Sequence, residues 1–197
     1  KPAAAPSAEG ELFGLNKVLA IDLELSASEY EGLQPPAAGF GPPGGPGGGP
    51  PPQPARNPAG KRESERNLFN VEFPWAHADV SLGGKSFKNV GLRYAGEITY
   101  FSSAQGLKRP LKIDFSKFAE QEFAGVTALQ LHSMPMDPAK GREIVAFSVF
   151  RSAGVPAPRT AFAEVTLTVP GKLSKELLGL YIVLENVDKR FLKSRFD

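Results

Sequence analysis

One segment of the chain is too rich in proline and glycine to contribute to a hydrophobic core. Between Pro35 and Gly60 the sequence has ten prolines and eight glycines in 26 residues. Such a composition buries too little apolar surface to offset the entropy lost on ordering, and glycine does not recur at every third position as in collagen. We therefore predict a disordered insertion at residues 35–60, in preference to a proline-recognition motif. A flexible leader at residues 1–10 precedes the first ordered segment at residues 11–34.

The remaining composition is that of a chain with a real core. Of the 197 residues, 41% are hydrophobic and 14 are Phe, while the formal net charge is +2. So small a charge gives no reason to expect nucleic acid as a partner, and no stretch approaches the roughly 18 apolar residues of a membrane span. The absence of cysteine excludes disulfides, thiolate catalysis and Cys-ligated metals. Because the chain begins with Lys1 rather than Met, we expect a processed start from which any signal peptide has been removed.

Alternating apolar residues predict strands along most of the sequence. A short helix at Ser28–Leu33 follows the first of them, and a glycine turn at Gly83-Gly84 joins two others into a hairpin. The predicted strands are Val18–Leu25, Val80–Leu82, Phe87–Tyr94, Leu111–Phe115, Ala161–Val169 and Leu178–Val187.

One principal helix is predicted before the last two strands. Asp137 is a good N-cap, Pro138 suits the first helical position, and Gly154 can end the helix in the left-handed conformation. Strands that surround one such helix indicate an α+β fold with a mainly antiparallel sheet.

Two charged residues stand out against this pattern. Lys112 alternates with Leu111 and Ile113, so it projects from the middle of a strand on the polar face. Glu143 lies in line with apolar residues of the helix, where an unpaired carboxylate is costly. A solvated strand face explains Lys112 equally well, and a favourable first-turn position or a pair with Lys140 or Arg142 explains Glu143. A strand lysine that meets an inward glutamate of the next helix is, however, the arrangement that kinases use at nucleotide phosphates.

Four stretches, in this order and at this spacing, resemble the spore-coat protein H (CotH) kinase family. They read KNVGLRYAGE, KRPLKIDF, GREIVAFSVFRSAGVPAPRT and GLYIVLENVDKRFL. The resemblance covers Val71–Phe196, with a looser match at Glu11–Leu33. It implies that residues 61–197 form a protein-kinase-like N-terminal lobe, and that the family phosphorylates Ser or Thr of proteins with ATP and Mg or Mn.

The resemblance also implies the residues of the site. Lys112 becomes the lysine that contacts the nucleotide phosphates, and Glu143 becomes its helical partner. The end of the last strand becomes the hinge that meets the adenine, and the turn GEITYFSS lies over the phosphates. The cofactor-binding residues predicted in these two segments are Glu185, Asn186, Val187 and Gly96.

The sequence departs from the family pattern in three places. The strand before the helix reads LQLHS, where the family has Asn-rich text of the LNLNN type, and YAGEITY lacks the basic residue and the Asn-Ser around the glycine. The catalytic base and the metal-holding residues of kinase-like proteins lie in a second lobe, for which no motif is found before Asp197. We therefore expect the metal ligands outside this chain and no phosphoryl transfer by the chain alone. His77 and His132 show no metal-ligand spacing.

Two functions follow. The first is the nucleotide-binding lobe of a CotH-like atypical protein kinase that acts on surface or coat proteins, in a secreted, periplasmic or cell-surface setting. The second is a non-catalytic CotH-like module for surface assembly through protein interaction. The expected partners are a nucleotide and a protein substrate or assembly partner, without nucleic acid or a membrane span. Retention of Lys112 and Glu143 favours the first function, whereas the Pro/Gly insertion and the altered turn favour the second.

Overall fold

The computed structural model describes residues 12–35, 62–103 and 105–196. The predicted leader at residues 1–10 and almost all of the predicted insertion at residues 35–60 lie outside this part of the chain.

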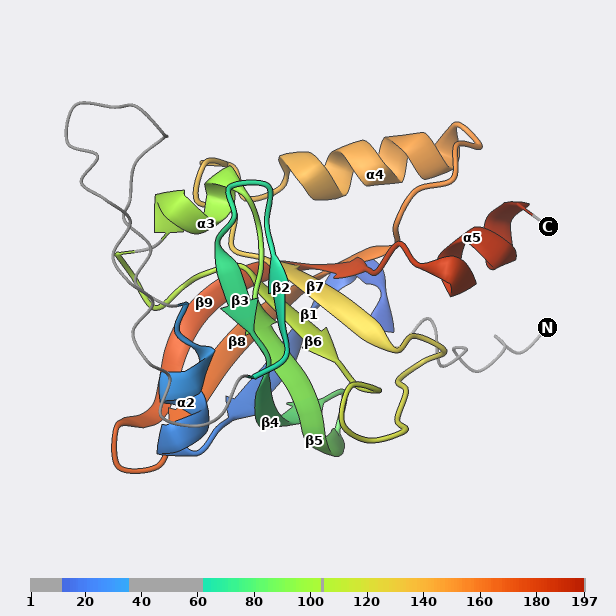
Figure 1. Cartoon of the computed structure of the whole chain (residues 1–197). Helices are drawn as coiled ribbons and strands as arrows, with labels where there is room; N and C mark the ends of the chain where they lie inside the picture. The colour runs from blue at the N-terminus through green and yellow to red at the C-terminus, as the bar shows by residue number, and fades with distance from the viewer. Residues whose placement is uncertain (1–11, 36–61, 104, 197) are drawn as a thin grey trace.

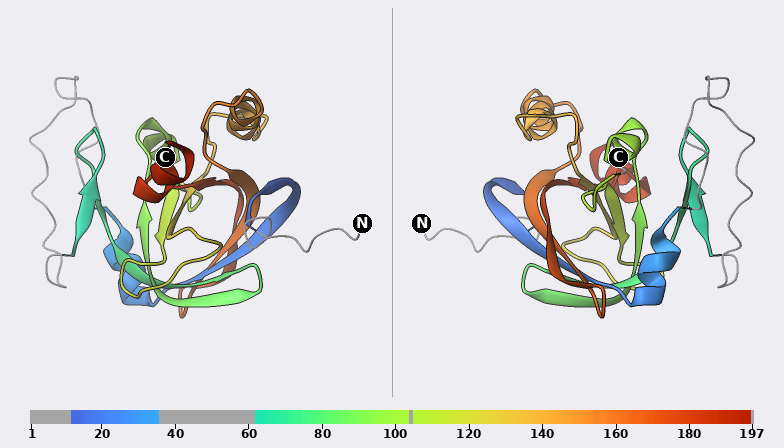
Figure 2. Two further views of the ribbon diagram at one scale, coloured as in Figure 1. Left: turned by 90° about the vertical axis from the view of Figure 1, so that its right-hand side faces the viewer. Right: turned by 90° about the vertical axis from the view of Figure 1, so that its left-hand side faces the viewer.

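Seven strands form a closed barrel in the order β1-β4-β5-β6-β7-β9-β8 (Figures 1 and 2). Six of the neighbouring pairs are antiparallel, and β1 closes the ring by pairing in parallel with β8. The strands of the barrel are β1 (Gly14–Glu24), β4 (Ala76–Leu82), β5 (Lys85–Tyr94), β6 (Leu111–Asp114), β7 (Ala128–His132), β8 (Thr160–Val169) and β9 (Leu173–Glu185).

This barrel corrects the predicted fold. The expected α+β fold, a kinase-like N-terminal lobe with one principal helix, is wrong because the sheet closes into a barrel and has no open edge, although its pairing is mainly antiparallel as expected. β1 pairs with β4 on one side and with β8 on the other, for example Ile21 with Leu82 and with Val165. Alternation of apolar residues identifies a strand but carries no information about a partner some 140 residues away, so closure was not visible in the pattern.

Alternate side chains of the strands fill the inside of the barrel. In β6, Leu111 and Ile113 are buried while Lys112 and Asp114 are half-buried on the outer face. The hairpin at Gly83-Gly84 is confirmed, since both glycines have positive φ, 59° and 73°, between β4 and β5. These left-handed values suit glycine, which has no Cβ to clash.

The helices lie around the barrel rather than across an open sheet. Their bounds are α2 (Ala27–Leu33), α3 (Ile98–Ser103), α4 (Arg142–Ser152) and α5 (Lys189–Phe196). The longest of the described helices, α4, lies outside the barrel in Figure 1 and in both views of Figure 2. Ile144 is its one buried residue, packed in a small cluster with Met134, Ile182 and Leu184 that is separate from the barrel core. The one principal helix predicted from the sequence therefore contributes little to the core.

This helix also begins later than predicted. Lys140 has φ 53°, so the chain leaves the helical path there and Gly141 becomes the N-cap. Asp137 accepts hydrogen bonds from the backbone N–H groups of Ala139 and Arg142, at 3.0 and 2.9 Å, and so stabilises the preceding turn. The predicted left-handed end is confirmed at Gly154, with φ 78°.

A second, two-stranded sheet stands outside the barrel wall. It consists of β2 (Ser64–Arg66) and β3 (Glu72–Pro74), paired in antiparallel fashion. Figure 2 shows this hairpin along the outer side of the strands, separate from the ring. No sequence pattern had predicted it.

Candidate functional site

A cavity of about 700 Å³ lies on the outer face of the barrel. The β2–β3 hairpin, the start of α3, strands β5 to β7 and the first turn of α4 border it. Lys112, Glu143 and Gly96, three of the residues predicted from the sequence, line this cavity together. The structure thus brings one half of the predicted site into one place.

Strand register determines which side chains reach this cavity. Arg93 of β5 lies opposite Lys112 of β6, which lies opposite Gln130 of β7. Residues in register on neighbouring strands point to the same face, and all three line the cavity. The row therefore presents two cations and an amide side by side.

Lys112 is the lysine of this row and is half-buried. Its Nζ lies 5.9 Å from the centre of the Trp75 ring, which Arg93 and Lys117 also approach, at 5.0 and 5.2 Å. Among the described residues Lys112 makes no ion pair, whereas Lys117 pairs with Glu63. Lys112 is thus a cation in a cavity without a carboxylate partner.

Glu143 does not pair with Lys112. One of its oxygens, Oε2, lies 2.8 Å from Nδ1 of His132 in β7, and both side chains are about one-third exposed, at 34% and 35%. The proposed kinase-type pair of the two residues is therefore not formed in this structure, although both line the same cavity.

Arg93 is the deepest charge in the cavity, with 8% of its surface exposed. Its guanidinium donates to Glu65 at 2.5 Å and to the Tyr94 carbonyl at 2.8 Å. Burial lowers the pKa of Arg93, and the neighbouring Glu65 opposes this effect. Arg93 Nε and Trp75 Nε1 are buried and have no hydrogen-bond partner within the described parts of the chain.

The carboxylates that line the cavity, in contrast, all have partners. Glu65 binds Arg93, Glu143 binds His132, and Glu97 accepts a 2.9 Å hydrogen bond from the Leu68 backbone. Lys112 has no partner of opposite charge among the described residues. Its charge favours an anionic guest, because an anion finds there a charged donor that is not yet occupied.

Gly96 lies at the entrance to α3 with φ 90°. A Cβ at this position would come within 2.5 Å of Thr99 Oγ1, so the backbone needs glycine here. Residues 98–103, which the resemblance places over the phosphates, form the short helix α3 rather than an open glycine loop. The β2–β3 hairpin contributes Glu65, Arg66 and Phe73 to the same cavity.

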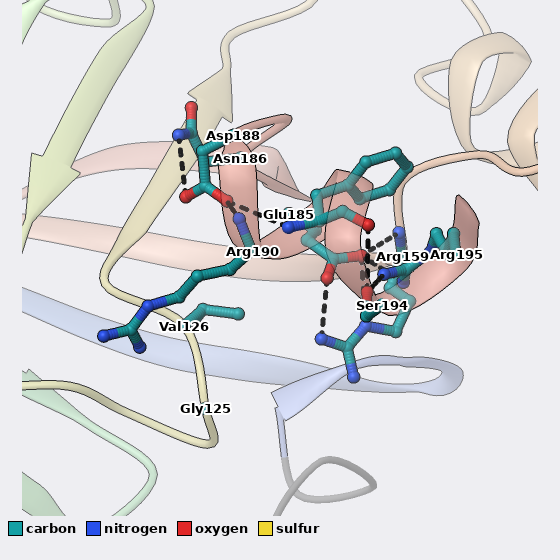
Figure 3. Close-up of a pocket in the computed structure, with 10 residues that line it drawn as sticks. Gly125, Val126, Arg159, Glu185, Asn186, Asp188, Arg190, Ser194 and Arg195 are labelled. Atoms are coloured by element: carbon teal, nitrogen blue, oxygen red, sulfur yellow. Dashed lines mark hydrogen bonds and ion pairs between the residues drawn. The ribbon is translucent and has the colours of Figure 1, made fainter. Parts of the chain in front are cut away.

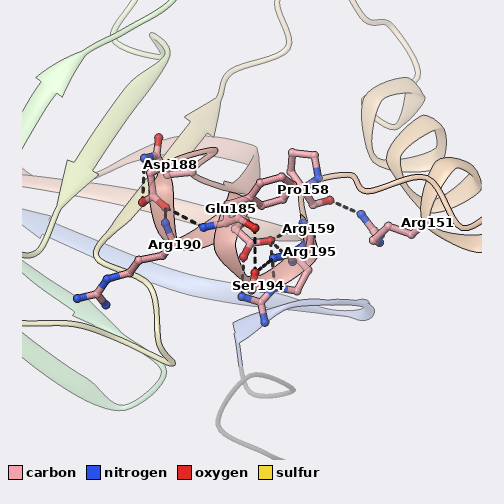
Figure 4. A network of polar contacts seen from close by, with 10 residues as sticks. Arg151, Pro158, Arg159, Glu185, Asp188, Arg190, Ser194 and Arg195 are labelled. Atoms are coloured by element: carbon pink, nitrogen blue, oxygen red, sulfur yellow. Dashed lines mark hydrogen bonds and ion pairs between the residues drawn. The ribbon is translucent and has the colours of Figure 1, made fainter. Parts of the chain in front are cut away.

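The predicted hinge residues lie elsewhere. Glu185 and Asn186 line a separate cavity of about 510 Å³ next to α5 (Figure 3), and Val187 is exposed and lines neither. Glu185 is 4% exposed, and its carboxylate accepts hydrogen bonds from Arg159 and Arg195 (Figure 4). The structure therefore does not bring the hinge residues into the cavity of Lys112.

One contact connects the two cavities. Gln130, which lines the larger cavity, donates from Nε2 to Oδ1 of Asn186 at 3.2 Å. Asn186 in turn lies 3.4 Å from Asp188, whose other oxygen caps the start of α5 (Figure 3).

Sequence reasoning missed Arg93, Gln130 and His132. The alternation in GLRYAG places Arg93 on a face of its strand, but the register that sets it beside Lys112 comes from strand pairing. Across the described residues, no group of three or more His, Asp or Glu side chains gathers as a metal site would require. No described helix is long and apolar enough to cross a membrane.

Comparison with known proteins supports the resemblance seen in the sequence. Residues 92–197 match the family described as CotH kinase protein. A search of curated proteins finds no match to the chain.

Proposed function

The chain belongs to the CotH kinase protein family, and from this membership we propose that its cavity beside Lys112 binds ATP for a protein kinase. The proposed reaction is phosphorylation of Ser or Thr side chains of surface or coat proteins. Bound ATP supplies the γ-phosphoryl group: the hydroxyl oxygen bonds to the γ-phosphorus as the bond to the departing ADP breaks, and the hydroxyl proton passes to a base that we expect outside this chain. The proposed setting is outside the cytoplasm, in the envelope or at the surface.

The unpaired charge of Lys112 carries this proposal. A lysine ammonium without a carboxylate partner, in register with a second cation, Arg93, suits the oxygens of a polyphosphate. Lys112 would contact the phosphates. We assign no residue of this chain as a ligand of the Mg or Mn ion that accompanies ATP.

The adenine end of the nucleotide is a separate part of the proposal. Residues 185–187 remain the predicted adenine contact, and the Gln130–Asn186 hydrogen bond supports a connection between this segment and the cavity of Lys112. The backbone N–H of Glu185 already donates to the Arg159 carbonyl at 3.0 Å, so Asn186 and Val187 are the better candidates for base recognition.

Calorimetric titration of the chain with ATP and Mg or Mn tests the proposal. We expect Lys112→Met to weaken binding by about tenfold or more, which corresponds to ~1.4 kcal/mol. Lys117→Met is the matched control, because Lys117 approaches the same Trp75 ring but pairs with Glu63 and does not line the cavity. The ATP affinity of the Lys117→Met variant should stay within about twofold of that of the unchanged chain. Equal affinity of the Lys112→Met variant and the unchanged chain would remove Lys112 from this role.

A non-catalytic interaction module is the second candidate function. The observation that favours it is the apolar outer surface of α4, where Val145, Val149 and Phe150 are 57%, 59% and 49% exposed. Exposed apolar side chains grouped on one helix are typical of interaction surfaces. If ATP does not bind with either metal ion, this second function replaces the first.

A further inference from the structure

We propose that His132 is a positioning residue that keeps Glu143 away from Lys112 and connects it to the start of α5. The inference rests on the proposed function, in which Glu143 would orient Lys112 at the phosphates. It adds His132 as a residue that competes with Lys112 for Glu143 and so controls whether the Lys112–Glu143 pair forms.

A continuous series of polar contacts carries the inference. Glu143 Oε2 lies 2.8 Å from His132 Nδ1, and His132 Nε2 lies 3.4 Å from Gln130 Oε1. Gln130 Nε2 lies 3.2 Å from Asn186 Oδ1, and Asn186 Nδ2 lies 3.4 Å from Asp188 Oδ2. The series thus runs from α4 across β7 to the first turn of α5.

The two ends of the series fix the direction of every hydrogen bond. Ionised carboxylates only accept, so Asn186 must turn its amide nitrogen to Asp188 and its oxygen to Gln130. Gln130 must then donate to Asn186, which leaves its oxygen facing His132. At the other end Glu143 requires a donor from His132 Nδ1.

His132 therefore faces acceptors on both ring nitrogens. The imidazolium form satisfies both, because each of its nitrogens carries a proton. In the neutral ring one nitrogen is bare, and the strong contact with Glu143 then keeps the proton on Nδ1.

The way in which α4 packs on the barrel allows Glu143 to exchange partners. The apolar seat of the helix is the small cluster around Ile144 rather than the barrel core, and its polar contacts besides His132 are those of Arg142 with Asp137 and of Arg151 with the Pro158 carbonyl. Lys112 lines the same cavity and has no carboxylate partner. Removal of the His132 contact should let Glu143 move to Lys112.

Double-mutant cycles on urea unfolding of the full chain test this exchange without nucleotide. His132→Phe and Glu143→Ala should give non-additive shifts of the unfolding midpoint, since they share one contact. The shifts of the midpoint caused by Lys112→Met and by Glu143→Ala should be additive when His132 is present. They should become non-additive in a chain that carries His132→Phe. His77→Phe is the control, because His77 stacks on Phe118 away from the cavity and should leave every coupling unchanged.

Three results would overturn the inference. They are additive effects of His132→Phe and Glu143→Ala, coupling of Lys112 with Glu143 in the unchanged chain, or no coupling of these two after His132→Phe. Because the cycles use no nucleotide, failure of ATP to bind refutes the proposed function and leaves these results standing. Conversely, the ATP affinity could depend on Lys112 while His132 and Glu143 show no coupling. That result would refute this inference and leave the proposed function standing.

The proton position gives a second, spectroscopic test. Long-range ¹⁵N–¹H spectra of the chain at alkaline pH should place the single ring proton of His132 on Nδ1. Asn186→Ala, which cuts the series at its distant end, should shift the Nε2 signal of His132 and leave His77 unchanged. A bare Nδ1 in His132 would contradict the proposed contact with Glu143.

Discussion

Arg159 binds both carboxylate oxygens of Glu185. Its Nε donates to Oε2 at 3.1 Å and its Nη2 donates to Oε1 at 2.8 Å, while its backbone N–H adds a third hydrogen bond at 3.1 Å. Arg195 of α5 donates to the same carboxylate at 2.8 Å (Figure 4). One buried glutamate thus joins the beginning of β8, the end of β9 and α5.

Glu185→Gln should therefore destabilise the chain by about 3 kcal/mol, because a buried ion pair that loses one charge leaves the other uncompensated. Urea denaturation measures this loss of unfolding free energy. Glu176→Gln is the control, since Glu176 lies exposed in the same strand. A loss below about 1 kcal/mol would show that the arginines find compensation in solvent.

Ile144→Ala should loosen α4 without unfolding the barrel. Ile144 belongs to the small cluster with Met134, Ile182 and Leu184, so the local cost of about 2 kcal/mol falls on this helix. Faster hydrogen exchange of the α4 amides, with unchanged exchange in β4 and β5, is the expected result. Val145→Ala, at an exposed neighbouring position, should change neither. Equal acceleration throughout the barrel would contradict the separation of the two clusters.

Acid should weaken the contact that holds α2 to the barrel. Burial raises the pKa of Glu29, but the hydrogen bonds from Arg62 and the His77 backbone and the charge of Arg62 outweigh it and hold the pKa below its ordinary value. A lowered carboxyl pKa stabilises the fold above the unfolded-state value and loses this contribution as the pH falls through the folded-state value. Glu29→Gln should thus cost about 1–2 kcal/mol at neutral pH and progressively less as the pH falls through the lowered pKa of Glu29.

Urea denaturation over a series of pH values measures this dependence. Glu31→Gln on the same helix is the control, because Glu31 pairs with Lys172 in an exposed contact and should contribute at most about 0.5 kcal/mol. A cost of Glu29→Gln that does not change with pH would refute the role of its charge.

The chain contains one Trp, and this residue lies beside the proposed phosphate contact. Lys112, Arg93 and Lys117 all approach the Trp75 ring, at 5.9, 5.0 and 5.2 Å. ATP that draws Lys112 toward its phosphates should change the emission of Trp75, and Lys112→Met should remove this change. Binding seen by calorimetry without any change in emission would place the nucleotide elsewhere.

The sequence by itself determined the local elements and the family. Alternation predicted the strands that became β4, β5, β6 and β8, and the paired glycines predicted the turn at residues 83–84, because these depend on neighbours along the chain. The four quoted stretches identified the CotH kinase family, which the match over residues 92–197 confirms. Lys112, Glu143 and Gly96 could be named from the sequence as a group, and they line one cavity.

Only the tertiary structure decided how these parts meet. The parallel pairing of β1 with β8 closed the barrel, and the register of β5, β6 and β7 set Arg93 and Gln130 beside Lys112. The packing of α4 against the barrel gave Glu143 a histidine as its partner instead of the expected lysine. Such choices depend on contacts between residues far apart in the chain, and a side chain there pairs with the group that packing places within hydrogen-bond distance.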